Sequence, residues 1–281
     1  MRESSFQEIV LQPQYLKGTQ GDLFSLFAAP KDKDQTIFLF LPSFAEELNR
    51  CRVMVAMQAR QLVAQGYGCL LLDYYGTGDS QGDFSENHWD QWEKDVDSAY
   101  RWLQSQGYHH VALWGLRLGA MLALSCAVKQ PERYRKILLW QPVIDGSAFM
   151  TQFLRLRIAM LMDRGLKKET ALEMRAMLQT GSSIEVAGYE ITAQMVRGID
   201  AQKMIEYPVS DKLPIIDWFE VTMEEKGDLP LASQRLLQTW SDKKINYRVH
   251  TYTGPFFWQL HERELTPLLI ERTLASLKLA G

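Results

Sequence analysis

The stretch Val111-Ala-Leu-Trp-Gly-Leu-Arg-Leu-Gly-Ala120 decides how this sequence folds. An apolar, strand-like run leads into Gly115 and Gly119, and the Ala- and Leu-rich segment that follows is typical of a helix. This is the layout of a nucleophile elbow, G-x-S-x-G, in which a sharp strand-to-helix turn exposes the central side chain at the top of a sheet. The central residue here is Arg117, so the sequence predicts the turn without its usual nucleophile.

Strands and helices alternate around this stretch. Apolar runs predict strands at residues 22–29, 36–41, 69–72, 136–140, 214–221 and 246–253, and helical periodicity predicts helices at residues 51–65, 89–106, 118–129, 231–240 and 262–279. This order indicates a mostly parallel sheet with helices on both faces. The pattern is interrupted after Asp145 by a methionine-rich segment that we expect to be helical. We therefore predict an α/β core formed by residues 1–146 and 206–281, with a helical cap at residues 147–205.

Composition excludes several classes of partner. The chain has 281 residues, a formal net charge of -3 and a hydrophobic content of 46%, which suits a packed globular protein and gives no sign of nucleic-acid binding. Cys51, Cys69 and Cys126 have neither metal-ligand spacing nor the even number of a disulfide framework. The first residues lack the apolar region of a signal peptide, and no apolar run reaches the roughly 20 residues of a membrane span. We expect a cytoplasmic protein without metal or cofactor.

Two serine-containing loops follow predicted strands. The segment Asp73-Tyr-Tyr-Gly-Thr-Gly-Asp-Ser-Gln-Gly82 resembles the D-x-x-G-x-G-x-S-x-G loop of α/β-hydrolases. A phosphate-binding alternative is disfavoured, because the spacing is not G-x-G-x-x-G and no P-loop lysine is present.

The second loop, at residues 42–49, lies where α/β-hydrolases place the oxyanion loop. A backbone N–H of Ser43 or Phe44, together with that of Leu118, is predicted to face developing negative charge. Glu46 and Glu47 are unusual in such a loop. They either favour a helix N-terminus or pair with Arg117.

Three motifs together resemble one family. Pro-Ser-Phe-Ala-Glu-Glu-Leu-Asn-Arg-Cys-Arg, Leu-Trp-Gly-Leu-Arg-Leu-Gly-Ala and Gly-Pro-Phe-Phe-Trp-Gln are similar to the exosortase A system-associated hydrolase 2 family. The resemblance runs over almost the whole chain and implies an α/β-hydrolase fold. It also implies an association with bacterial exosortase and exopolysaccharide systems, and it makes Arg117 a family feature. It supplies no substrate.

The acid of a Ser–His–acid triad normally follows the strand predicted at residues 214–221. Glu224, Glu225 and Asp228 lie there, and Asp228 is the candidate, with a solvated turn as the alternative. The base should follow Gly254, but the chain reads Pro-Phe-Phe-Trp-Gln at residues 255–259, without histidine. The remaining histidines are expected on the surface, in a strand or on the next helix: His88, His109, His110, His250 and His261. Triad catalysis therefore lacks both its nucleophile and its base.

Substitute nucleophiles are few. Ser43, Cys51 and Ser125 are candidates, but none lies on the elbow. Cys51 comes near a predicted helix start, which would lower the pKa of its thiol, whereas the alternative is a buried structural cysteine.

Arg117 itself requires an anion, because a guanidinium is always charged and an unpaired buried charge costs several kcal/mol. It stands at a predicted helix N-terminus, where free N–H groups and the helix dipole also favour anions. The partner is either Glu46, Glu47 or Asp145, or the carboxylate, phosphate or sulfate of a small anionic or acyl-bearing ligand.

The predicted cap carries a basic cluster interleaved with apolar residues. Its cations are Arg155, Arg157, Arg164, Lys167 and Lys168. Such a helix either touches a membrane surface or packs its apolar side on the core, and its methionines suit an adaptable acyl pocket. Three functions stay open: a hydrolase or acyl transferase with a non-standard mechanism, a non-catalytic binding protein, and a partner-binding scaffold that works through the cap.

Overall fold

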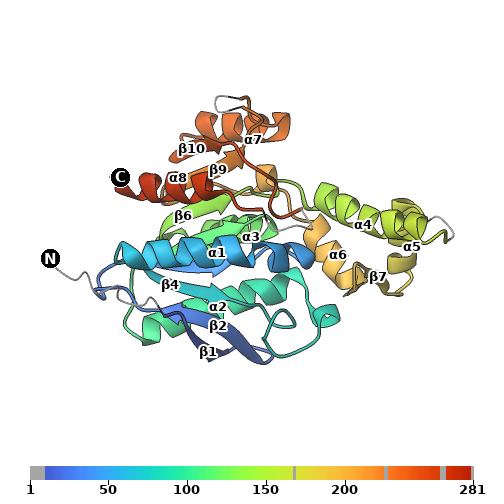
Figure 1. Cartoon of the computed structure of the whole chain (residues 1–281), viewed down its shortest axis with the longest axis horizontal. Helices are drawn as coiled ribbons and strands as arrows, with labels where there is room; N and C mark the ends of the chain where they lie inside the picture. Colours follow the sequence, from blue (N-terminus) through green and yellow to red (C-terminus); the bar gives the residue numbers. More distant parts are fainter. Residues whose placement is uncertain (1–9, 167–168, 225–226, 260–263, 280–281) are drawn as a thin grey trace.

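The computed structural model describes residues 10–166, 169–224, 227–259 and 264–279. Within these residues one sheet of eight strands runs in the order β1-β2-β4-β3-β5-β6-β9-β10 (Figure 1). Antiparallel pairing is confined to β1 with β2 and β2 with β4, and the other neighbours are parallel. The strands are β1 (Gln12–Lys17), β2 (Asp22–Ala28), β3 (Ile37–Leu41), β4 (Gly68–Leu72), β5 (Val111–Leu116), β6 (Tyr134–Trp140), β9 (Ile216–Val221) and β10 (Tyr247–Tyr252). This confirms the predicted α/β-hydrolase architecture.

Helices cover both faces of the sheet, because the central strands are apolar on both sides. In β3, Phe38 and Phe40 join one core with residues of α1 (Glu46–Ala64) and α8 (Pro267–Lys278). The alternate residues Ile37 and Leu39 join a second core with α2 (Trp89–Ser105) and α3 (Leu118–Lys129). Successive side chains of a strand point to opposite faces, so one short strand supports both cores. A further helix, α7 (Leu231–Asp242), lies between β9 and β10 in the chain.

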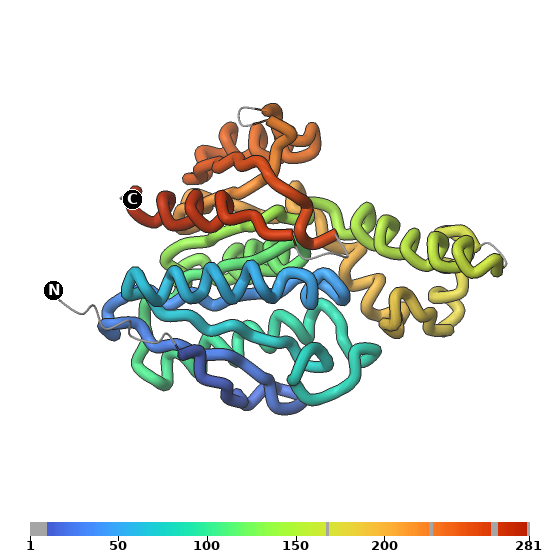
Figure 2. The backbone as a smooth tube through the Cα atoms, viewed as in Figure 1, coloured from blue at the N-terminus to red at the C-terminus, as the bar shows by residue number. Residues whose placement is uncertain are grey.

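The expected cap segment projects from the sheet between β6 and β9 (Figure 2). It contains α4 (Gly146–Asp163), α5 (Ala171–Gln179), α6 (Ala193–Asp200) and the short 3₁₀ helix Met204–Glu206. We predicted a wholly helical segment, and this is wrong at one place. A hairpin of β7 (Ile184–Val186) and β8 (Tyr189–Ile191) interrupts the helices. Its two turn residues, Ala187 and Gly188, both have positive φ, which is the geometry of a tight hairpin.

Two other local expectations need correction. Helix α1 begins at Glu46 rather than at residue 51, so both glutamates lie in its first turn. The edge strand β1 was not predicted, and its Pro13 fits an edge position because proline cannot donate a ladder hydrogen bond. Among the described residues, no helix combines the length and apolar character that a membrane crossing requires.

Candidate functional site

The elbow forms at the junction of β5 and α3. Arg117 has φ 57° and ψ -117°, and its N–H donates to the Trp140 carbonyl. A Cβ atom on Gly119 would lie 2.2 Å from the Leu41 carbonyl oxygen, and one on Gly115 would lie 2.4 Å from the Gly119 carbonyl oxygen. Both positions therefore require glycine, because the turn brings the start of α3 against neighbouring backbone. The predicted turn is present, with Arg117 at its apex.

Three protein groups hold the Arg117 side chain. Its Nε lies 3.3 Å from Glu47 Oε1, and its Nη1 donates to the Gln141 carbonyl at 3.2 Å. Its Cζ lies 5.0 Å from the centroid of the Trp258 ring, a cation–π contact. The side chain keeps 14% exposure, and none of the hydrogen bonds among the described residues uses Nη2. One end of the guanidinium is thus anchored, while the other stays open to a further acceptor.

Glu47 is the carboxylate that pairs with Arg117, which was one of the expected alternatives. It lies in the first turn of α1, after Ala45, which has φ 51°. Its pairing with Arg117 uses one oxygen, and its Oε2 is buried without a hydrogen-bond partner in the described part of the chain. Burial raises the pKa of the Glu47 carboxyl, and the nearby Arg117 and Arg50 oppose that rise.

The other two expected partners point elsewhere. Glu46 Oε2 accepts hydrogen bonds from Asn49 at 3.3 Å and from the Tyr189 hydroxyl at 3.2 Å, so it joins α1 to the cap segment. Asp145 is the N-cap of α4 and accepts from the Ala148 N–H at 2.8 Å. Pairing of Arg117 with Glu46 or Asp145 is therefore wrong, because each carboxylate already serves a local helix or cap contact.

Trp258 occupies the position at which a base was sought. The loop after β10 carries this indole onto Arg117, and its ring is buried. His250 lies on β10, stacked on Phe219 and bonded to Asp217 Oδ1 at 2.7 Å. Asp217 also pairs with Arg248 and Lys136, so this histidine belongs to a charge network at the beginning of β9.

The remaining histidines have structural surroundings where they are described. His88 caps α2 by accepting from the Gln91 N–H, and His109 and His110 bond to Gln104 and Arg135 before β5 begins. His261 lies outside the described residues.

The expected acid is solvated. Asp228 is exposed, and none of the hydrogen bonds or ion pairs among the described residues uses its carboxylate. Glu224 is exposed too, and Glu225 lies outside the described residues. Within the described residues, no contact supports the expected role of Asp228 as the triad acid.

A different carboxylate is buried at the end of β9. Glu220 is 7% exposed and accepts from Trp218 Nε1 at 2.7 Å and from Ser233 Oγ at 2.9 Å. Burial raises the pKa of Glu220, and its two hydrogen bonds and Arg117 act in the opposite direction. The available signal was a glutamate near the end of the mainly apolar strand Ile216–Val221.

The predicted oxyanion loop lies beside the elbow. None of the hydrogen bonds within the described residues uses the N–H groups of Ser43, Phe44 or Leu118. The Phe44 ring, however, packs between the core and α4 of the cap segment. It packs at 5.0–6.0 Å between ring centroids against Phe84, Trp92, Phe149 and Phe153. A pocket beside Phe44, Phe84 and Trp92 has a free volume of about 10 Å³, which is no more than one water molecule needs.

The substitute nucleophiles are buried. Cys51 is 1% exposed, and burial together with the Glu47 charge raises the pKa of its thiol. The expected lowering by a helix start is therefore wrong, because Cys51 lies beyond the first turn of α1 and inside the core. Ser125 is also buried and donates to Glu93 Oε1. Ser43 is 3% exposed.

The basic cluster of the cap is partly paired. Arg157 forms two hydrogen bonds to Glu169 and one to the Glu185 carbonyl, whereas Arg155 and Arg164 are exposed. Lys167 and Lys168 lie outside the described residues. Within the described part of the chain, no group of three or more His, Cys, Asp or Glu side chains is placed to hold a metal ion.

Comparison with known proteins identifies the family. The sequence model of the Hydrolase_4 family, serine aminopeptidase S33, matches residues 35–202. The chain belongs to this family. The match includes the elbow, the predicted oxyanion loop and nearly all of the cap segment.

Among curated relatives of this Hydrolase_4 chain are mitochondrial palmitoyl-protein thioesterases ABHD10. The Pongo abelii protein is 25% identical and the Homo sapiens protein 24% identical, each over 178 residues. The alignments cover 63% of this chain and 53% of those proteins, so the chain spans about half their length.

Solved structures agree on the fold. Est1E from Butyrivibrio proteoclasticus, in a structure with bound ferulic acid, superposes with a TM-score of 0.64 at 14% identity, covering 94% of this chain and 99% of that one. Mouse alpha/beta hydrolase domain-containing protein 10 gives a TM-score of 0.60 at 16% identity, covering 95% and 96%. At these identities the likeness establishes an α/β-hydrolase fold.

Proposed function

We propose that this Hydrolase_4 protein binds the anionic group of a carboxylate- or acyl-bearing ligand at its elbow, and that the elbow performs no nucleophilic attack. One observation carries the proposal: Arg117 stands at the nucleophile position, is fixed by three protein groups, and keeps Nη2 without a protein acceptor among the described residues. A guanidinium offers five donors and stays protonated, so it binds a carboxylate and cannot attack a carbonyl carbon.

The surroundings of Arg117 favour an anion at Nη2. The side chain sits at the N-terminus of α3, where the first N–H groups and the helix dipole add positive potential. Glu47 contacts Nε alone, so a second carboxylate can bind Nη2 without displacing it. The stacked Trp258 ring holds the guanidinium plane in place, which reduces the entropy lost on binding.

In this geometry, the nucleophile and base positions of a Ser–His–acid triad hold other residues. In a characterised serine hydrolase, loss of the nucleophile lowers turnover about a millionfold. Here the base position holds Trp258, whose indole N–H cannot accept a proton. The Cys51 thiol is buried with a raised pKa, so it is protonated and inaccessible.

The proposed setting is a bacterial exosortase and exopolysaccharide system, with the protein in the cytoplasm. The support for this setting is the resemblance of three motifs, at residues 42–52, 113–120 and 254–259. In such a setting the ligand would be an acyl-bearing or carboxylate-bearing precursor.

Calorimetric titration of the full chain with acetate, succinate and phosphate tests the proposal. Arg117→Gln should weaken the binding of the preferred anion about tenfold or more, since a hydrogen bond to a charged group contributes roughly 1.5–3 kcal/mol. Arg60→Gln, at an exposed arginine late in α1 that lies in neither proposed site, is the matched control and should bind that anion as the native chain does. Equal affinity in native and folded Arg117→Gln protein would overturn the proposal.

A second candidate function is ester or thioester hydrolysis. The unused N–H groups of Phe44 and Leu118 favour it, because two such donors form an oxyanion site in this fold. Similarity to palmitoyl-protein thioesterases points to the same substrate class. Turnover of p-nitrophenyl esters or acyl-coenzyme A thioesters above the buffer rate would support it. Rates equal to buffer across acyl lengths would exclude it.

A further inference from the structure

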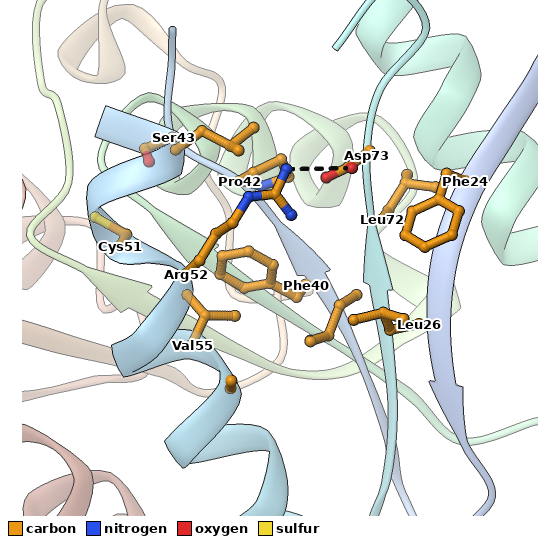
Figure 3. Close-up of a pocket in the computed structure, with 13 residues that line it drawn as sticks. Phe24, Leu26, Phe40, Pro42, Ser43, Cys51, Arg52, Val55, Leu72 and Asp73 are labelled. Atoms are coloured by element: carbon orange, nitrogen blue, oxygen red, sulfur yellow. Dashed lines mark ion pairs between the residues drawn. The ribbon is translucent and has the colours of Figure 1, made fainter. Parts of the chain in front are cut away.

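A separate cavity of about 170 Å³ lies between α1 and the β2, β4 and β3 strands (Figure 3). It is on the α1 face of the sheet, whereas the space filled by Phe44 is on the cap side. Its walls are mainly apolar and come from β2, β3, β4 and α1. They include Leu26, Phe40, Val55 and Ala56, and Arg52 and Asp73 are the charged residues.

The charged residues form an ion pair at one side of this cavity. Arg52 Nη2 lies 3.5 Å from Asp73 Oδ2, and Figure 3 shows the guanidinium reaching across the cavity toward that carboxylate. The Arg52 side chain is 45% exposed, while that of Asp73 is 10% exposed. Asp73 is the buried member of the pair, whereas nearly half of the Arg52 side chain is exposed, so further donors of the guanidinium can bind a second carboxylate while the contact with Asp73 remains.

Asp73 does not depend on Arg52 alone. Its Oδ2 also accepts from the Asp79 N–H at 3.2 Å. The turn at Gly78 makes this possible, because a Cβ atom there would lie 1.9 Å from the same oxygen. The carboxylate therefore keeps a donor when the guanidinium turns toward another anion.

The volume limits the ligand. A cavity of about 150 Å³ lined by Leu, Ile and Phe side chains stays dry and binds benzene. The cavity beside α1 is slightly larger and has a similar lining, with a cation at its side. An apolar body of about six carbon atoms fits it, and a carboxylate on that body reaches Arg52.

We propose that this cavity binds a small monocarboxylic acid, aromatic or short-chain, with its apolar body between α1 and β3 and its carboxylate on Arg52. The juxtaposition of an apolar cavity with a half-exposed guanidinium carries the proposal. The site shares no residue with the Arg117, Glu47 and Trp258 contacts and does not rest on the function proposed for them.

Titration of the full chain with benzoate and hexanoate, against 1-hexanol as the uncharged control, tests this site. Arg52→Gln should weaken both acids about tenfold, by the loss of a charge-assisted hydrogen bond, and leave hexanol unchanged. Ala56→Phe fills the cavity without altering charge and should abolish hexanol binding and the Arg52-dependent binding of both acids, while Arg117→Gln should retain hexanol binding.

Three results would overturn the proposal. They are native hexanol affinity in a folded Ala56→Phe protein, equal loss of acid and alcohol in Arg52→Gln, and loss of hexanol binding in Arg117→Gln. Since Arg117→Gln and Arg52→Gln report on different sites, failure here is distinct from failure of the elbow proposal. Circular dichroism of each variant establishes that it is folded.

Discussion

The Arg117 guanidinium lies 5.0 Å from the centre of the Trp258 ring, so the two positions that would carry a nucleophile and its base are joined by a cation–π contact. Such a contact contributes about 2 kcal/mol when it is desolvated. Glu47 completes the arrangement from the first turn of α1. The elbow is thus a packed, charge-paired site with one free guanidinium nitrogen among the described contacts.

Truncating the indole should destabilise the fold. Trp258 is 2% exposed, and replacing a buried tryptophan with alanine costs about 3–5 kcal/mol. Trp258→Phe keeps a ring over Arg117 and should cost less than half as much. Urea unfolding followed by circular dichroism measures both. If both variants lost the same free energy of unfolding, the contact of an aromatic ring with Arg117 would make no contribution to stability.

The Arg117–Glu47 pair should show strong energetic coupling. Arg117→Met leaves Glu47 buried without its cation, and Glu47→Gln leaves the cation with a neutral partner. Each single change should lower the free energy of unfolding, and the double variant should lose less than the sum, with a coupling of about 1–3 kcal/mol. The double-mutant cycle is measured by urea unfolding. Additive losses would mean that the two charges act independently.

Restoring serine at the elbow should not restore hydrolysis. In Arg117→Ser the hydroxyl has no histidine to take its proton, because Trp258 holds that position. We expect hydrolysis of p-nitrophenyl butyrate at the rate of the native chain. Arg117→Ala serves as the matched control for loss of the ion pair. A serine-dependent burst of p-nitrophenol would reveal a base that the described contacts do not contain.

Asp95 should make stability depend on pH. Burial raises its pKa to about 7, opposed by hydrogen bonds from the Tyr75 N–H and from Gln91. Because the pKa is raised in the folded state, the native protein holds a proton that the unfolded chain releases near pH 4. Stability should fall as the pH rises from about 4 to 7. Asp95→Asn should flatten this slope in urea unfolding, and an unchanged slope would remove Asp95 as its source.

Much of the fold was predictable from local patterns. Helix α3 begins and ends as predicted, because Gly115 and Gly119 mark the turn and an unbroken Ala- and Leu-rich run follows. The interior strands are continuous apolar runs, which identify them without knowledge of their partners. The hairpin of β7 and β8 was missed because each strand has three residues, too few for a periodic signal.

The candidate site was predictable only in part. The charge of Arg117 and its need for an anion follow from the residue type, but the choice among Glu46, Glu47 and Asp145 depends on where α1 and α4 begin. The stacking of Trp258 joins a loop to an elbow far away in the chain, and no local pattern encodes such a contact. Burial of Cys51, one of the two alternatives expected for it, raises the pKa of the thiol, and tertiary packing decides between those alternatives.

The most direct test of the central claim is calorimetric titration of small anions into native protein and Arg117→Gln, with p-nitrophenyl ester turnover measured on the same preparations. We predict saturable binding of a carboxylate by the native chain, about tenfold weaker in the variant, and no ester turnover above buffer in either protein. Equal anion affinities together with ester turnover that survives in Arg117→Gln would contradict the claim that this elbow is an anion-binding site.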